Sequence, residues 1–111
     1  MTDIEQIAER DFQEKVLDQK DTPVLVQFIS PYCVPCKSLG LQVEKVAEHF
    51  AESLIVYKID ALQSPDLCKE FAITSVPRLF LFNKGNLIGD IAGSNSKSTS
   101  LIEWIQNSLN N

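Results

Sequence analysis

The chain has 111 residues, of which 44% are hydrophobic and 23% are charged, and its formal net charge at pH 7 is −5. This length and composition predict one soluble globular domain that can bury a core without structural disulfides. The negative charge argues against nucleic acid and anionic membranes as partners, because both would repel the chain. No apolar run approaches the roughly 20 residues of a membrane-spanning helix.

The first ten residues carry four charges and no apolar stretch, so they do not have the pattern of a secretory signal peptide. We therefore expect a reducing compartment, the cytoplasm, where a disulfide usually serves catalysis or sensing. There is no internal repeat and no linker composition. We expect residues 1–111 to form a single domain that acts as a monomer.

Near the N-terminus, residues 4–8 fit either a short edge strand or an extension of the helix that follows. Asp11 and Glu14 predict a capping box for a helix that ends near Asp18. Two of its apolar side chains would face inward, Phe12 and Val16.

Residues 24–29 form an unbroken apolar run, which predicts a strand covered on both faces. Farther along, apolar residues recur at three- and four-residue steps and predict a helix of about four turns. These residues are Leu39, Val43, Val46, Ala47 and Phe50. Residues 55–60 predict a second apolar strand, and strand, helix and strand together predict a parallel βαβ unit.

Ser64 is expected to cap a short helix that has Pro65 at its first position and ends near Phe71. Two further strands, residues 78–83 and 86–92, are separated by two residues that permit only a tight antiparallel hairpin. A last helix carries an apolar stripe formed by Leu101, Ile102, Ile105 and Leu109. The sum is an α/β fold, a mixed sheet with helices on both faces.

The sequence Cys33-Val34-Pro35-Cys36 lies between the first central strand and the long helix. Cysteines at this spacing can close a disulfide across one turn, and a helix N-terminus stabilises the thiolate, which is the nucleophile of disulfide exchange. Pro35 suits a first helical turn because its missing N–H costs nothing there. We expect Cys33 to be exposed and Cys36 to be more buried, with Lys37 adding a positive charge beside the pair.

Two segments carry a resemblance to a known family: residues 30–37, Ser-Pro-Tyr-Cys-Val-Pro-Cys-Lys, and residues 75–78, Ser-Val-Pro-Arg. The chain resembles the thioredoxin family from about residue 4 to residue 109. The resemblance implies a thioredoxin fold in which Pro77 is cis and lies against the cysteine pair. It also implies that the Val76 backbone pairs with an extended substrate segment and that Gly93 borders the same docking surface.

Several positions depart from the family pattern. Gln27 stands where many thioredoxins have a buried aspartate beneath the cysteines, and Val56 is taken as the position of the lysine that accompanies it. Losing both charges together is physically reasonable because a lone buried charge is costly. Tyr32 replaces a tryptophan and Val34 replaces a glycine, so both are expected to shape the rim that receives substrates.

Zinc binding is the main alternative use of a CxxC pair, but zinc needs four ligands. Besides the pair, only Cys68 and His49 could serve. His49 lies thirteen residues beyond Cys36 on the same predicted helix, about 20 Å away at 1.5 Å per residue. We therefore expect no metal site within one chain. Cys68 is expected to fill a half-buried apolar position, with a redox-sensing or dimerising role as the alternative.

The function expected from these features is thiol–disulfide exchange, with reduction of other proteins' disulfides through a Cys33–Cys36 dithiol. No bound cofactor is needed, and the resemblance implies that a thioredoxin reductase restores the dithiol. Arg78, where the family often has threonine, suggests a preference for acidic substrate segments. The alternatives are a redox-responsive binding module with little turnover and a disulfide oxidant or isomerase.

Overall fold

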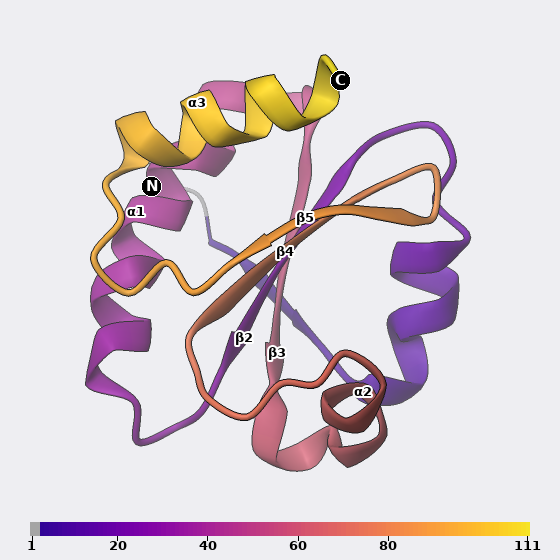
Figure 1. The fold of residues 1–111 in the computed structure, drawn as a ribbon, viewed down its shortest axis with the longest axis vertical. Helices are drawn as coiled ribbons and strands as arrows, with labels where there is room; N and C mark the ends of the chain where they lie inside the picture. Colours follow the sequence, from indigo (N-terminus) through magenta and orange to yellow (C-terminus); the bar gives the residue numbers. More distant parts are fainter. Residues whose placement is uncertain (1–2) are drawn as a thin grey trace.

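A computed structural model describes residues 3–111 and has a five-stranded mixed sheet at its centre, in the order β1-β3-β2-β4-β5 (Figure 1). The strands are β1 (Glu5–Ile7), β2 (Val24–Ile29), β3 (Ile55–Asp60), β4 (Arg78–Asn83) and β5 (Asn86–Ile91). The strands β1, β3 and β2 run parallel, whereas β4 is antiparallel to both β2 and β5. The predicted α/β class and the parallel pairing of β2 with β3 are therefore confirmed.

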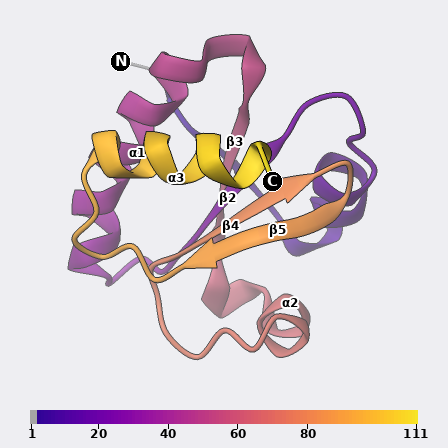
Figure 2. The same ribbon diagram turned by 45° about the horizontal axis from the view of Figure 1, so that its top comes forward.

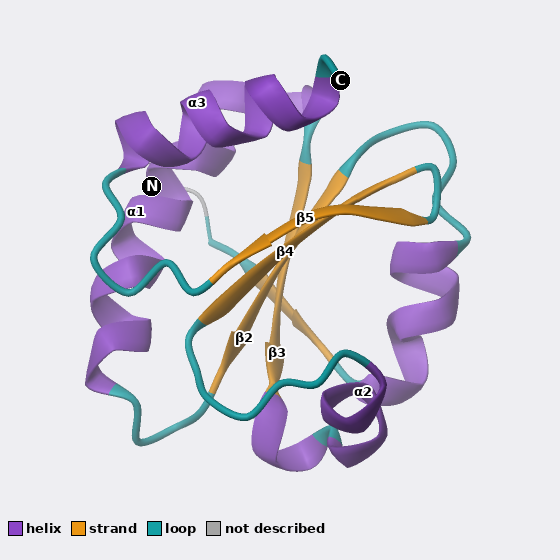
Figure 3. Cartoon of the chain, in the orientation of Figure 1, coloured by secondary structure: helices purple, strands orange, loops and turns teal. Residues whose placement is uncertain are grey.

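Three α-helices cover the sheet: α1 (Val34–Phe50), α2 (Pro65–Glu70) and α3 (Ser98–Leu109). Figure 3 shows α1 and α3 on one side of the strands and α2 on the other, and α3 lies beside α1 in Figure 2 as well. On the side of α2, a 3-10 turn (Glu9–Asp11) and a π-helical segment (Gln13–Leu17) complete the layer.

The sheet separates two hydrophobic cores, which explains why β2 is buried along nearly its whole length. One core lies under α1 and α3 and contains Leu25, Leu39, Val43, Leu101 and Ile105. The other lies under α2 and the N-terminal helical segments and contains Phe12, Val16, Phe28, Phe80 and Phe82. Alternation along a strand sends successive side chains to opposite cores.

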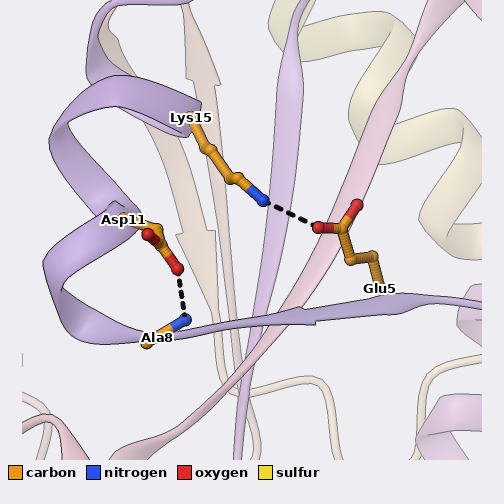
Figure 4. A network of polar contacts seen from close by, with 4 residues as sticks. All are labelled: Glu5, Ala8, Asp11 and Lys15. Carbon is orange, nitrogen blue, oxygen red and sulfur yellow. Dashed lines mark hydrogen bonds and ion pairs between the residues drawn. The ribbon is translucent and has the colours of Figure 1, made fainter.

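The N-terminal segment resolves one open expectation and corrects another. Residues Glu5–Ile7 form the edge strand β1 rather than an extended helix. The helical segment starts earlier than predicted, because the Asp11 carboxylate accepts a hydrogen bond from the Ala8 N–H at 3.2 Å (Figure 4). The predicted box with Glu14 was therefore wrong in its position. Lys15 closes the turn against β1 through a 2.8 Å ion pair with Glu5 (Figure 4).

The cap of α2 also differs from the prediction. Ser64 stands at the N-cap position, but its hydroxyl donates to the Asp60 carbonyl at 2.8 Å and makes no capping bond. Instead, the Glu9 carboxylate accepts from the Leu67 N–H at 2.8 Å. A residue 58 positions away in sequence therefore satisfies the first turn of α2, which short-range reasoning could not foresee.

The hairpin between β4 and β5 has the tight form that was predicted. Lys84 and Gly85 have φ angles of 55° and 80°, so both central residues are left-handed as a type I′ turn requires. The strand β5 ends at Ile91, one residue before the predicted end. The hairpin carries the chain from the Pro77 end of β4 to Gly93 at the same end of the sheet.

Candidate active site

The cysteine pair lies where the central strand β2 turns into α1. Cys33 is the N-cap residue of α1, and its Sγ accepts a hydrogen bond from the Cys36 N–H at 3.1 Å. Pro35 occupies the first turn of α1, as predicted. The two cysteines form a disulfide, with their Cα atoms 5.2 Å apart. The first turn holds no acidic residue, so nothing there offsets the positive end of the helix dipole.

The exposure of the two cysteines differs less than expected. In the disulfide form, Cys33 is 9% exposed and Cys36 is 5% exposed, so the prediction of a clearly exposed Cys33 was wrong for this state. A disulfide covers each sulfur with the other, which reduces the contrast between them. The side chains that project into solvent are the flanking Tyr32, 89% exposed, and Val34, 71% exposed.

The peptide bond between Val76 and Pro77 is cis, as the resemblance implied. Pro77 immediately precedes β4, and the antiparallel register pairs Arg78 with Phe28 near the end of β2. The cis proline therefore lies at the end of the sheet from which the chain continues to Cys33. Val76 and Ser30, on the loop after β2, line a common hollow of about 200 Å³.

Gly93 lies between β5 and α3 with a φ of 76°, a conformation that favours glycine. A Cβ atom there would meet Leu39 at 3.5 Å and Leu79 at 3.4 Å. Leu39 is on α1, one turn after the cysteine pair. These contacts place the Gly93 loop against the N-terminal part of α1.

Comparison with known proteins decides the family. A sequence model described as Thioredoxin matches residues 3–107. The chain belongs to the thioredoxin family. It is 33% identical to thioredoxin of Porphyra purpurea over 96 residues, 86% of this chain and 89% of that protein. It is 32% identical to thioredoxin of Rickettsia bellii over 103 residues, 93% of this chain and 96% of that protein.

Family membership and the Cys33–Cys36 disulfide together make this thioredoxin-family chain a thiol–disulfide oxidoreductase. It is also 33% identical to thioredoxin M4, chloroplastic, of Arabidopsis thaliana over 97 residues, which are 87% of this chain and 50% of that protein. Within residues 3–111, no helix is long and apolar enough to cross a membrane.

Gln27 is buried on β2, with 2% of its surface exposed. Its Nε2 donates a hydrogen bond to the Cys36 carbonyl at 3.2 Å. An uncharged amide is buried at low cost when it is hydrogen-bonded in this way. Because this amide has no proton to gain or lose near neutral pH, Gln27 holds the first turn of α1 without acting as an acid or base.

The interpretation of Val56 as the partner position of Gln27 was wrong. The β2–β3 ladder pairs Gln27 with Lys58 and pairs Leu25 with Val56. Lys58 also lines the same cavity as Gln27 and Cys36, whereas Val56 packs against the core under α1. The positive charge near the buried position is therefore retained, and only the negative one is replaced. Lys37, the other predicted cation, is exposed on α1 and lines the same cavity.

Arg78 directly follows the cis proline and is held from two sides. Its Nη2 donates to the Asp90 carboxylate at 2.6 Å, and its guanidinium lies 5.2 Å from the centroid of the Phe80 ring. The side chain is 20% exposed, and its Nε is buried without a hydrogen-bond partner. Asp90 therefore balances much of the charge that the sequence suggested would face substrates.

The metal alternative gains no support. His49 is in the last turn of α1, where its ring packs edge-on against Phe50 with centroids 4.9 Å apart. Among residues 3–111, no cluster of three or more His, Cys, Asp or Glu side chains could hold a metal ion.

Cys68 is the free cysteine of the described chain, and it is half-buried on α2. Its thiol contacts the Ala61 carbonyl at 3.5 Å and borders the hollow that Val76 lines. Burial raises the pKa of the Cys68 thiol, and the nearby charge of Glu9 raises it further. Both effects disfavour the reactive thiolate.

We therefore expect Cys68 to react slowly with iodoacetamide at neutral pH. In a variant with both Cys33 and Cys36 changed to serine, alkylation should be slower than that of a free cysteine peptide. The rate should still be rising at a pH where the peptide has reached its plateau, because a raised pKa shifts thiolate formation to higher pH. Alkylation as fast as the peptide's at neutral pH would contradict this account.

Proposed function

We propose that this thioredoxin-family chain reduces disulfides of other proteins, with Cys33 as the attacking residue and Cys36 as the resolving one. The observation that supports these roles is the position of Cys33 at the N-cap of α1, where its sulfur accepts the Cys36 N–H. Hydrogen bonding to the charged form and the helix dipole both lower the free energy of a thiolate at this position. Among residues 3–111, none donates such a hydrogen bond to the sulfur of Cys36, which lies one turn inside the helix.

The proposed cycle has two exchange steps that balance in atoms and electrons. The Cys33 thiolate attacks a substrate disulfide, forms a bond to one sulfur and releases the other as a thiolate. Cys36 then loses its proton and attacks the Cys33 sulfur, which expels the second substrate thiolate and forms the Cys33–Cys36 disulfide. The substrate gains two electrons and the dithiol loses two. Proximity makes the second step fast because both cysteines belong to one helical turn.

The substrate-binding surface is proposed to surround the disulfide. Tyr32 and Val34 offer exposed apolar side chains beside Cys33, and apolar contact area is the main source of docking energy. The Val76 backbone would pair with an extended substrate segment, with Pro77 and Gly93 bordering it. Val76 precedes β4, and its backbone groups make no backbone hydrogen bond to another residue of the described part of the chain.

The partners we propose are disulfide-containing proteins and a thioredoxin reductase, which returns two electrons to the pair. The cycle requires no bound cofactor, since the disulfide itself carries the electrons. We propose that the chain works as a single thioredoxin-like domain and a monomer in a reducing compartment, the cytoplasm.

The equilibrium reduction potential tests the direction of this function. A reductant must give up electrons to substrates in a glutathione-buffered compartment, so we expect a Cys33–Cys36 potential below about −240 mV. Equilibration with defined glutathione ratios, followed by acid trapping and mass analysis, measures this value. A potential above about −200 mV would instead assign the protein to disulfide formation or isomerisation.

The substitution Gln27→Asp should accelerate the Cys36 step near neutral pH, because a carboxylate beneath Cys36 can accept its proton. We expect a gain on the order of tenfold in single-turnover reduction of a peptide disulfide. The same change removes the amide donor to the Cys36 carbonyl and should lower the free energy of unfolding by about 1–3 kcal/mol. Gln27→Asn, equal in size to aspartate but uncharged, is the control. An unchanged or lower rate in Gln27→Asp would refute the claim that a carboxylate at this position speeds deprotonation of Cys36.

Arg78 should favour acidic substrate segments only to the extent that Asp90 leaves its charge available. The substitution Asp90→Asn removes the neutralising carboxylate and should raise the preference for acidic over basic peptide disulfides about two- to fivefold in kcat/KM. Arg78→Gln should abolish the preference. Equal selectivity in both variants and in the wild type would show that Arg78 does not contribute to the preference between acidic and basic substrates.

A further inference from the structure

A cavity of about 450 Å³ lies between α1 and the sheet and reaches the resolving cysteine. Its walls include Cys36 and Glu44 from α1, Gln27 from β2 and Lys58 from β3. The cavity is partly open to solvent and has room for on the order of ten water molecules. Polar side chains interrupt its largely apolar lining and can hydrogen-bond this water. Cys36 therefore lines a cavity that is open to solvent.

The helix presents a regular column of residues to this cavity. Cys36, Gly40 and Glu44 follow one another at four-residue steps, which places them on one face of α1. Glu44 is half-buried, and its backbone lies about 12 Å along the helix from that of Cys36 at 1.5 Å per residue. Glu44 is thus too far for direct contact but lies on the same water-accessible path.

Gly40 keeps this path open. A Cβ atom at this position would have no heavy atom within 4 Å, so packing does not demand glycine. Glycine in a helix interior costs about 0.5–1 kcal/mol relative to alanine, and no positive φ offsets that cost here. What glycine provides at this position is empty space between Cys36 and Glu44.

We propose that Glu44 accepts the proton of Cys36 through water in this cavity and passes it to bulk solvent. This inference rests on the proposed role of Cys36 as the resolving residue. The Cys36 S–H bond breaks, its proton moves along the water to the Glu44 carboxylate, and the thiolate attacks the Cys33 sulfur of the mixed disulfide. The substrate sulfur leaves with the electron pair of the broken S–S bond. Glu44 then loses the proton to solvent.

The charged groups around the cavity also affect how easily Cys36 loses its proton. Besides Glu44, the charged groups that line it are Lys37 on α1, Lys58 on β3 and Asp3 in the segment before β1. The lysines favour a thiolate at Cys36, whereas the carboxylates oppose it. Electrostatics alone would therefore make Cys36 easier to deprotonate when Glu44 is neutralised. If Glu44 accepts the proton, neutralising it should instead make Cys36 harder to deprotonate. The direction of the change therefore distinguishes proton transfer from a purely electrostatic effect.

The test follows the mixed disulfide in single turnover. Reduced protein is mixed with a peptide disulfide and quenched with acid at intervals over a range of pH. In Glu44→Gln, we expect the mixed disulfide to form at the wild-type rate but to decay more slowly near pH 6.5, on the order of tenfold. The deficit should shrink as pH rises, since hydroxide then removes the proton directly, and added imidazole should restore the rate.

Two further variants make the test specific. Gly40→Leu keeps the carboxylate but fills the path, and it should slow the same decay without preventing folding, because the site has free space. Glu48→Gln makes the same charge change one turn farther along α1, outside the cavity lining, and should leave the decay unchanged.

Unchanged or faster decay in Glu44→Gln would overturn the proposal, as would wild-type decay in Gly40→Leu. Failure of the proposed function has a different signature. If Cys36→Ser forms no substrate adduct at Cys33, the two-cysteine cycle is wrong, and the role of Glu44 fails with it.

Discussion

Changing Cys33 to serine should lower disulfide reductase activity by a factor on the order of a thousand or more. A hydroxyl cannot form the mixed disulfide, and no other cysteine of the described chain occupies the N-cap of a helix. The fold should tolerate the change, because serine is itself a favourable N-cap residue and Cys33 occupies the N-cap of α1. Insulin reduction coupled to dithiothreitol oxidation measures the loss.

Cys68, the cysteine outside the disulfide, supplies a matched control. Cys68→Ser removes a thiol of raised pKa that lies on α2, and it should leave the turnover rate near that of the wild type. If Cys33→Ser retained substantial activity while Cys68→Ser lost it, the roles assigned to the two cysteines would have to be exchanged.

The second large effect is on stability. Phe80→Ala should lower the free energy of unfolding by about 3–5 kcal/mol, because it opens a cavity in the core under α2. The Phe80 ring packs edge-on against Phe28 and Phe71, with centroids 5.3 Å and 5.4 Å apart. It also lies beneath the Arg78 guanidinium. Urea denaturation of the wild type and the variant measures the difference.

Phe80→Leu separates volume from aromatic contact. Leucine fills much of the same space, so its cost should be clearly smaller than that of alanine. A loss below about 1 kcal/mol for Phe80→Ala would contradict the packing described for this core. The position matters for function because Phe80 is two residues beyond Arg78 on the strand that begins at the cis proline.

The sequence was sufficient to predict the main elements because their signals are local. The apolar run 24–29 and the four-residue spacing from Leu39 to Phe50 each depend on neighbouring residues alone. The cysteine pair and the cis proline were likewise found from short motifs. These local signals were sufficient because the apolar face that each pattern predicts is the face that packs against the core in the folded chain.

Features that depend on distant residues were missed or misplaced. Val56 and Lys58 are two positions apart on β3, so both side chains point to the face of the sheet that α1 covers. Alternation cannot choose between them, and only the register of the β2–β3 ladder places Lys58 opposite Gln27. The Glu9 cap of α2 depends on tertiary packing in the same way.

The cavity beside Cys36 could have been suspected from the sequence. A glycine in a predicted helix interior, four residues from a cysteine and four from a glutamate, breaks the local preference without an evident turn. What the sequence could not supply is the opposite wall, because Gln27 and Lys58 reach the cavity from two strands whose pairing sets their position.

Trapping the first intermediate tests the central claim most directly. Reduced Cys36→Ser protein, mixed with a disulfide-containing protein and then treated with protease, yields a cross-linked peptide that mass analysis can locate. The account predicts one stable mixed disulfide, joined to Cys33. An adduct at Cys68, or no adduct while the wild type still reduces the same substrate, would contradict it.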